Sequence, residues 1–235
     1  PVDDARMRKD AKEQELLRDA GRINDLAIAY GLSHVDAAVT EAELAKQIDA
    51  FFLAHGGKQV GQYQVVCYGA NAAHPHHMSD DTLPRPGDSV LIDLVCPIND
   101  YWCDMTRTVF YRQVSEQHRR VYEVVRHAQQ AGIDFVRPGV RMSQIDAAVR
   151  QVIVDAGYGA AFITRTGHGI GLMVHEPPDV SISSDVVAQE GMVFSIEPGI
   201  YLPGDTGVRI EDLVLVTADG CEVLTHYPKE LQIIS

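Results

Sequence analysis

The chain has 235 residues, of which 46% are hydrophobic and 23% are charged, and this ordinary globular composition excludes disordered, collagen-like and low-complexity classes. Its 33 acidic residues outnumber 20 Lys and Arg residues and give a formal net charge of −13. That charge argues against nucleic-acid binding, because phosphate backbones would repel the chain. No apolar run approaches the roughly 20 residues that span a bilayer, and residues 1–4 show no secretory signal, so we expect no membrane association.

The N-terminus and the cysteines bear on processing and compartment. The chain begins with Pro1 instead of Met, so we expect a processed protein or a fragment of a longer one. None of the four cysteines forms a CxxC pair, which predicts buried reduced thiols and a cytoplasmic location instead of a zinc ribbon or a redox motif. They are Cys67, Cys96, Cys103 and Cys221.

The first half of the chain predicts two helices followed by three strands. Thr40 and Glu43 form a capping box at the start of the second helix, and the Gly56-Gly57 pair ends it. A loop rich in His, Asn and Pro, at 70–88, separates the first strand from the next two. The expected elements are helices over 6–30 and 40–55, and strands over 63–68, 89–95 and 105–111.

The second half predicts the same order of elements. Ser115 and Ser143 are expected to cap its two helices, and Pro138-Gly139 breaks the chain between them. The expected elements are helices over 115–131 and 143–156, and strands over 191–196, 208–216 and 222–225.

A short repeated pattern supports a duplication. Residues 87–93 (GDSVLID) and 191–197 (GMVFSIE) each place an acid six residues after a glycine, at the end of an apolar strand. No composition shift marks a linker, so we predict one α/β domain over residues 1–235. Its two pseudo-symmetric halves are expected to share a curved, mostly antiparallel sheet.

Four acidic residues occupy duplicated positions in these strands: Asp93, Asp104, Glu197 and Glu211. An ionised carboxylate in an apolar strand costs several kcal/mol unless it is paired or bound to a metal. A salt bridge to Arg107 or Arg209 would explain one such acid, but two arginines do not neutralise four. Because carboxylates are hard oxygen ligands that can bridge two ions, the pattern favours a pair of divalent cations.

Two histidines lie seven residues apart in the segment TGHGIGLMVHEPP, residues 166–178. Glycines on both sides of His168 would let the backbone approach closely or take a positive φ, and His175 follows. The glycines superficially resemble a phosphate-binding loop. That alternative is rejected, because the segment lacks the preceding strand, the third glycine at the right offset and a following helix.

These motifs, with CDMTRTV, FSIEPGIY and GVRIEDLVLV, resemble the pita-bread dinuclear metallopeptidases. That group includes aminopeptidase P, prolidase and methionine aminopeptidase, with creatinase as a relative that uses no metal. Glu197 and Glu211 are 14 residues apart, a short connection that is similar to prolidase and bacterial Xaa-Pro peptidases. Pro75-His76 lies 17 residues before Asp93, where the Xaa-Pro group also has a functional histidine.

The resemblance implies a function and a metal site. It implies hydrolysis of the Xaa-Pro bond in dipeptides or at the N-terminus of peptides, by a hydroxide that bridges two divalent metals. The hard donor set favours Mn²⁺, with Co²⁺ or Zn²⁺ as substitutes. Asp93 would chelate one ion, His168 and Glu197 would bind the other, and Asp104 and Glu211 would bridge both.

Other roles also follow from the resemblance. Glu197 would shuttle a proton to the leaving amine, while His76 and His175 would hold the substrate and stabilise the tetrahedral intermediate. His74 and His77 flank His76 and remain alternatives to it. Arg209 would be a charge partner of the ligand carboxylates.

Several alternatives stay open at this level. The family's Xaa-Pro members normally carry an N-terminal creatinase-like domain, which we expect either to have been removed from this chain or to be missing from a short member. The length alone matches a methionine aminopeptidase. A non-peptidase metalloenzyme such as a lyase, or a peptide-binding scaffold without catalysis, would use the same fold. No Arg follows His175 closely, so the preference between dipeptides and longer peptides is open. The resemblance also allows a homodimer.

Overall fold

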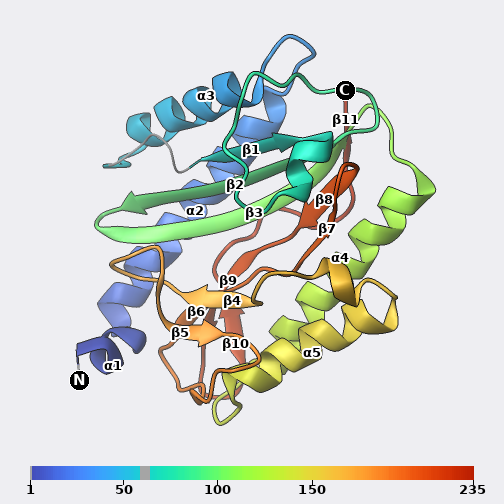
Figure 1. Cartoon of the computed structure of the whole chain (residues 1–235). Helices are drawn as coiled ribbons and strands as arrows, with labels where there is room; N and C mark the ends of the chain where they lie inside the picture. The colour runs from blue at the N-terminus through green and yellow to red at the C-terminus, as the bar shows by residue number, and fades with distance from the viewer. Residues whose placement is uncertain (1, 59–63) are drawn as a thin grey trace.

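The two halves of the chain each form a sheet covered by two helices (Figure 1). This computed structural model describes residues 2–58 and 64–235. In the first half, α2 and α3 pack against the sheet that contains β1, β2 and β3, whereas in the second half α4 and α5 pack against the sheet of β4 to β6. The predicted α/β class with two similar halves is therefore confirmed.

Helices supply the outer layers of both halves. Within the described residues, no helix is long and apolar enough to cross a membrane. The α-helices are α1 (Val2–Met7), α2 (Ala11–Ser33), α3 (Glu41–Ala54), α4 (Glu116–Phe135) and α5 (Met142–Asp155), and the short 3₁₀ helices are η1 (Gly69–Ala73) and η2 (Gly159–Ala161).

The strands of the first half are longer than those of the second. In the first half they are β1 (Val65–Tyr68), β2 (Ser89–Ile98) and β3 (Tyr101–Tyr111). In the second half they are β4 (Gly167–Gly169), β5 (Glu176–Val180), β6 (Val193–Ile196), β7 (Gly199–Leu202), β8 (Thr206–Arg209), β9 (Asp212–Val216), β10 (Cys221–Val223) and β11 (Ile233–Ile234).

The strands form three hydrogen-bonded sheets, whereas we expected a single sheet shared by the two halves. Their orders are β1-β2-β3-β11, β10-β9-β6-β4-β5 and β7-β8. All pairs are antiparallel except β11 with β3, which confirms the mostly antiparallel prediction. At the junction of the halves, the Glu211 backbone N–H donates to the Thr106 carbonyl over 3.1 Å. This bond joins the two halves where the acidic residues lie.

Two predicted helix starts are wrong for the same physical reason, the choice of capping residue. The helix expected at 6 begins at Ala11, because the Asp10 carboxylate caps it and forms a capping box with Glu13. Ser143 lies inside α5, which begins at Met142 with Arg141 at the N-cap position. The caps predicted at Thr40 and Ser115 are confirmed.

The strand predictions differ from the structure mainly at turns. The strand expected over 208–216 is two strands, β8 and β9, that break at 210–211. β2 and β3 extend to a tight hairpin because Asn99 and Asp100 adopt positive φ angles of 51° and 72°. β4, β5, β7 and β11 were not predicted. The start of the strand expected over 63–68 lies outside the described residues.

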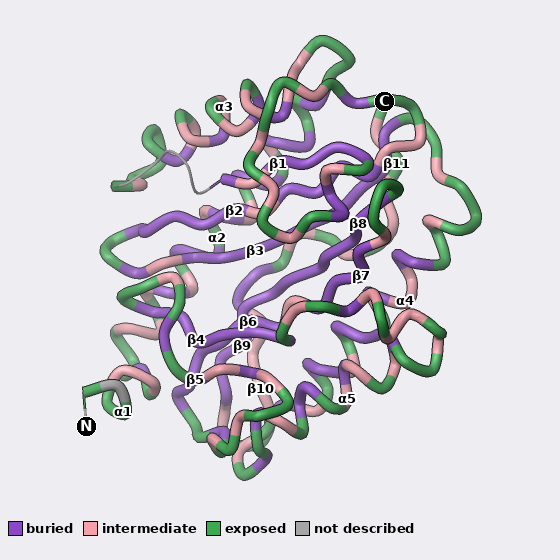
Figure 2. Tube along the Cα trace, in the orientation of Figure 1, coloured by how far each residue is buried: buried purple, intermediate pink, exposed green. Residues whose placement is uncertain are grey.

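Each half buries its own hydrophobic core. The larger cluster joins α4 and α5 to β6, β8 and β9, and the other joins α2 and α3 to β1, β2 and β3. Figure 2 shows the sheet strands as mostly buried and the surrounding loops as mostly exposed. The cysteines form no disulfide in the described part of the chain. A smaller cluster, in which Leu17 of α2 packs with Val193 and Leu213, connects the two cores. Two connected cores fit a duplicated fold whose predicted site residues lie at the junction.

The capping box of α3 gives a stability prediction. Thr40 Oγ1 accepts a hydrogen bond from the Glu43 backbone N–H, and the Glu43 carboxylate accepts from the Thr40 N–H. We expect Thr40→Ala to lower the free energy of unfolding by about 1 kcal/mol, or the melting temperature by about 2–4 °C. Thr40→Ser keeps the hydroxyl and should retain stability in the same thermal-unfolding measurement. Equal loss in both variants would contradict this account.

Candidate metal centre

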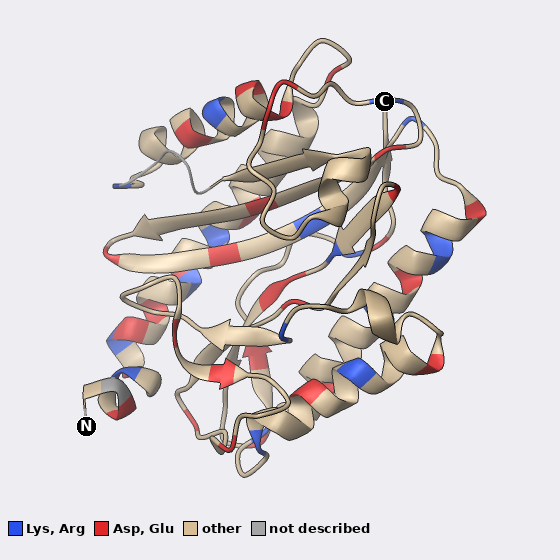
Figure 3. Ribbon diagram, in the orientation of Figure 1, with Lys and Arg blue, Asp and Glu red and all other residues tan. Residues whose placement is uncertain are grey.

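The first two carboxylates come from the β2–β3 hairpin. Asp93 lies opposite Thr106, and Asp104 lies two residues before Thr106 on the same strand. Because side chains alternate along a strand, Asp93, Asp104 and Thr106 share one face of the sheet. Figure 3 shows acidic positions within β2 and β3, away from the strand ends.

The second half contributes His168, Glu197 and Glu211 from the opposite side. His168 lies on β4, Glu197 directly follows β6, and Glu211 lies between β8 and β9. The His168 Nε2 atom is 3.2 Å from Glu197 Oε1 and 3.5 Å from Asp104 Oδ2. Ligand atoms of Asp104, His168 and Glu211 all lie within 4.8 Å of one another. The five sequence-predicted ligand positions line one cavity of about 370 Å³.

The cluster carries more negative charge than its burial tolerates. Asp104 and Glu211 are 4% and 1% exposed. Burial, followed by repulsion from neighbouring carboxylates, raises the pKa of both side chains well above the ordinary range. Arg209 and His168 offset only part of this repulsion. The negative charge of the site is therefore not fully compensated by the side chains, and additional positive charge would stabilise it.

Arg209 holds the first-half side of the cluster in place. It donates from Nη2 to Asp93 Oδ2 over 2.5 Å, from Nε to Thr106 Oγ1 over 3.0 Å, and from Nη1 to the Tyr201 hydroxyl over 2.9 Å. Thr106 in turn donates its hydroxyl hydrogen to Glu211 Oε2 over 2.7 Å. The arginine thus orients one carboxylate directly and a second through a threonine that the sequence did not single out.

Arg107 does not reach the ligand carboxylates, although it was one of two arginines considered as their salt-bridge partners. Its Nη2 donates to Asp212 Oδ1 over 2.7 Å, and its Nη1 donates to the Glu211 backbone carbonyl over 2.6 Å. Side chains alternate along β3, so Arg107 faces away from Asp104 and Thr106. Its role is to fix the backbone behind Glu211.

Glycines beside His168 allow β4 to pass close to its neighbours. A Cβ atom on Gly167 would lie 1.9 Å from the Ser195 carbonyl oxygen, and one on Gly169 would lie 2.3 Å from the Pro177 carbonyl oxygen. The His168 ring bonds through Nδ1 to the Gly169 carbonyl over 3.1 Å. This contact directs Nε2 toward the carboxylates, as is usual for histidines that bind metals.

Three further histidines line the cavity. The His175 ring stands edge-on to His168 with centroids 4.1 Å apart. Desolvation, together with the nearby His168 ring, lowers the pKa of His175 to about 4. His76 lies on the wall with His77, and within the described residues its ring makes no hydrogen bond. The His77 ring instead bonds to Glu41 over 2.8 Å, and His74 is not part of the lining.

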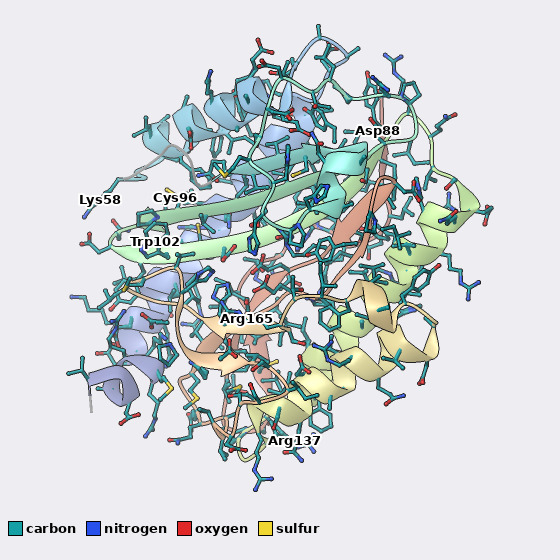
Figure 4. The ribbon with its side chains drawn as sticks, viewed as in Figure 1. Lys58, Asp88, Cys96, Trp102, Arg137 and Arg165 are labelled. Atoms are coloured by element: carbon teal, nitrogen blue, oxygen red, sulfur yellow. The ribbon has the colours of Figure 1, made fainter. Side chains whose placement is uncertain are left out.

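Arg165, which precedes His168 in the sequence, places a cation near His175. Arg165, labelled in Figure 4, donates from Nη1 to Asp179 Oδ1 over 2.7 Å, and Asp179 pairs with His168 across β4 and β5. Arg165 lines a second depression with His168 and His175. The pairing of β4 with β5 brings the segment of Arg165 alongside that of His175, and that pairing gave no sequence signal.

The donor set fits divalent metal ions. Glu211 Oε1 is buried and has no hydrogen-bond partner in the described part of the chain. A buried acceptor of this kind is costly unless a partner from outside the chain, such as a metal ion, satisfies it. Four carboxylates and one imidazole provide hard oxygen ligands with one nitrogen. Positive ions at this point would also relieve the repulsion that raises the pKa of Asp104 and Glu211.

Known proteins resemble this chain in sequence and in fold. The model of metallopeptidase family M24 matches residues 15–218. An Xaa-Pro dipeptidase from Lactobacillus delbrueckii subsp. lactis is 44% identical over 230 residues, which cover 97% of this chain and 62% of the relative. The prolidase structure from Pyrococcus horikoshii OT3 has a TM-score of 0.96 at 35% identity, with 98% of this chain and 67% of that chain covered. The X-Pro aminopeptidase structure from Thermotoga maritima MSB8 has a TM-score of 0.96 at 34% identity, with 99% and 66% covered.

These similarities confirm the pita-bread fold that the sequence motifs predicted. They extend over nearly the whole chain, but the chain spans less than two thirds of the length of the curated relatives, between 62% and 64%. The matched region includes all five clustered ligand positions. Because that region covers most of the sequence, this chain belongs to metallopeptidase family M24.

Proposed function

We propose that residues 1–235 form the catalytic domain of a peptidase that hydrolyses the bond between a first residue and a following proline. The observation that carries the proposal is that all five predicted ligand side chains line one cavity, where Asp104, His168 and Glu211 lie within 4.8 Å of one another and Glu211 Oε1 lacks a partner among the described residues. The relatives named above act as Xaa-Pro dipeptidase, prolidase or X-Pro aminopeptidase by their descriptions. Those names support proline specificity.

The cluster would hold two divalent ions. Asp93 would bind one ion, His168 and Glu197 the other, and Asp104 and Glu211 both. The excess of carboxylates favours Mn²⁺, with Co²⁺ or Zn²⁺ as substitutes. When bound, such ions would lower the pKa of a coordinated water toward about 7 and polarise a carbonyl oxygen.

The side chains of the chain orient the substrate and move protons. Ser195 Oγ donates to Glu197 Oε1 over 3.0 Å, which fixes the carboxylate that would carry a proton to the leaving proline nitrogen. His175 is neutral at pH 7 because its pKa lies at about 4, so it would act on the substrate as an N–H donor. His76 would donate from the opposite wall, and Arg209 would keep Asp93 oriented.

The surroundings of the cavity suit a short, proline-containing substrate. Val65, Val95 and Val174 supply apolar walls, and a volume of about 370 Å³ lies near the lower end of typical ligand sites. Arg165 keeps donors beyond its single bond to Asp179 and lies next to His175. We propose that it attracts the terminal carboxylate of a dipeptide.

The reduced cysteines support a cytoplasmic protein, and we retain a homodimer as its proposed assembly.

Metal removal tests the proposed function. Chelation followed by desalting should abolish hydrolysis of Ala-Pro and Ala-Pro-Ala, and Mn²⁺ should restore it. Cleavage of the dipeptide alone would identify a prolidase, and cleavage of the tripeptide an aminopeptidase P. Mass spectrometry on the protein as purified should find about two divalent ions per chain.

The same experiment separates the alternatives. A peptide-binding scaffold would hold no metal and cleave neither substrate. Preference for a peptide that begins with Met-Ala would indicate a methionine aminopeptidase. Turnover of small organic acids without peptide hydrolysis would indicate a lyase, and each of these results would overturn the proposal.

A further inference from the structure

A fully buried carboxylate outside the metal centre organises the loop that carries His76. Glu41 is the first residue of α3, and its side chain is 0% exposed. Its Oε1 accepts from the Tyr68 backbone N–H over 2.6 Å and from Asn71 Nδ2 over 3.0 Å. Its Oε2 accepts from His77 Nε2 over 2.8 Å and from the Asp80 backbone N–H over 3.1 Å. All four donors belong to residues 68–80.

The backbone of α3 adds to the same contact. The Glu41 N–H donates to the Thr82 carbonyl over 3.1 Å, and the Ala42 N–H donates to the Asp80 carbonyl over 3.0 Å. The first turn of a helix has unsatisfied N–H groups, and here the loop satisfies two of them. Both ends of the segment are therefore fastened to one helix terminus.

His76 lies in the middle of the fastened segment. The His77 N–H donates to the His74 carbonyl over 3.0 Å, which closes a turn whose central residues are Pro75 and His76. The residue that closes this turn, His77, is also the one whose ring bonds to Glu41. His76 is exposed toward the cavity, whereas Glu41 lies behind the loop and does not line it.

Glu41, His77 and Asp80 come close enough to suggest a second metal site, but the hydrogen bonds of Glu41 exclude that interpretation. A carboxylate offers about four acceptor positions, and Glu41 uses four with donors from the loop. Burial raises the pKa of Glu41, while these four donors oppose the rise. The bonds hold the loop, and no lone pair is left for an ion.

We propose that Glu41 is a positioning residue that acts through His76: its carboxylate holds the loop so that the His76 imidazole faces the reacting peptide. The inference rests on the proposed function, because it needs His76 to contact the substrate. It assigns to a side chain of helix α3 an effect on turnover that requires no contact with metal or substrate.

A double-mutant cycle tests this coupling in the metal-loaded protein. Glu41→Gln keeps the shape of the side chain but replaces one acceptor oxygen by a donor, which faces N–H groups on either side. We expect kcat/KM for Ala-Pro to fall by about 10-fold to 100-fold with metal content unchanged. On a His76→Ala background, the same substitution should cause no further loss.

Two variants keep the test independent of stability. Thr40→Ala weakens the same helix terminus without touching the loop, so it should lower the melting temperature yet leave kcat/KM unchanged. Asn71→Ala removes one of the four donors and replaces Glu41→Gln in the test if that variant does not fold. It should cause a smaller loss of kcat/KM, and none on the His76→Ala background.

The outcomes separate this inference from the proposed function. Absence of peptide hydrolysis by the metal-loaded wild-type protein would refute the proposed function. An active wild type in which Glu41→Gln is fully active, or in which its loss multiplies with that of His76→Ala, would overturn the role of Glu41. Loss of metal in Glu41→Gln would also overturn it, because the effect would then not pass through His76.

Discussion

Glu211→Gln should eliminate metal binding and turnover together. Glu211 is buried, its Oε1 has no partner among the described residues, and it lies among Asp104 and His168. The amide keeps the size of the side chain and can still accept from Thr106, but it loses the negative charge that two cations would share. We expect hydrolysis of Ala-Pro to fall below detection and bound metal, measured by mass spectrometry, to fall with it.

In the absence of metal, Glu211→Gln should be more stable than the wild-type protein. Burial and repulsion from Asp104 raise the pKa of Glu211, so the metal-free wild type contains a carboxylate cluster under strain. Removing one charge relieves that repulsion. In the presence of a chelator, the melting temperature of Glu211→Gln should therefore exceed that of wild type, with about 2–4 °C expected for each kcal/mol gained.

Glu222→Gln provides the matched control. Glu222 pairs with Arg18 on the surface, where an ion pair contributes little. This variant should keep both metal and activity. If Glu211→Gln retained metal and turned over peptide, or if its metal-free form were less stable than wild type, the assignment of Glu211 as a bridging ligand would be wrong.

The gathering of these acidic side chains at one cavity could be predicted because burial and charge conflict at their positions. Asp93 lies within the apolar strand β2 and Glu197 directly follows β6, and each is followed further along the chain by another acid, Asp104 or Glu211. Such acids are costly as isolated side chains, so four at duplicated positions indicate cations. Arg107 was wrongly considered as a partner of these carboxylates, because the alternation that places Asp104 on the cluster face of β3 places Arg107 on the opposite face.

Features that depend on tertiary contacts could not be predicted. β4 has three residues, Gly167 to Gly169, and no hydrophobic period marks so short a strand. Its pairing with β5 is what brings Arg165 to His175. Glu41 was also missed, because an acid in the first turn of a helix is ordinarily a surface residue that interacts with the helix dipole.

His175→Ala should lower turnover while the metals stay bound. His175 packs edge-on to His168 but lies outside the group of ligand atoms that converge, so its removal leaves the carboxylates and His168 in place. The loss is that of one donor to the developing oxyanion, for which a fall in kcat of about 10²–10³-fold is usual. Metal content and kcat for Ala-Pro should be measured on the same preparation.

The neutral state of His175 sharpens this expectation. With a pKa of about 4, its ring carries no charge at pH 7, so it contributes an N–H group and not a cation. His175→Asn restores an N–H donor on a shorter side chain and should recover part of the lost kcat, which a general acid or base role would not permit. His127→Ala, a substitution in α4 outside the cavity lining, should change neither quantity. If His175→Ala lost metal to the same extent as Glu211→Gln, His175 would be a ligand, and the division between metal-binding and substrate-binding histidines would have to be redrawn.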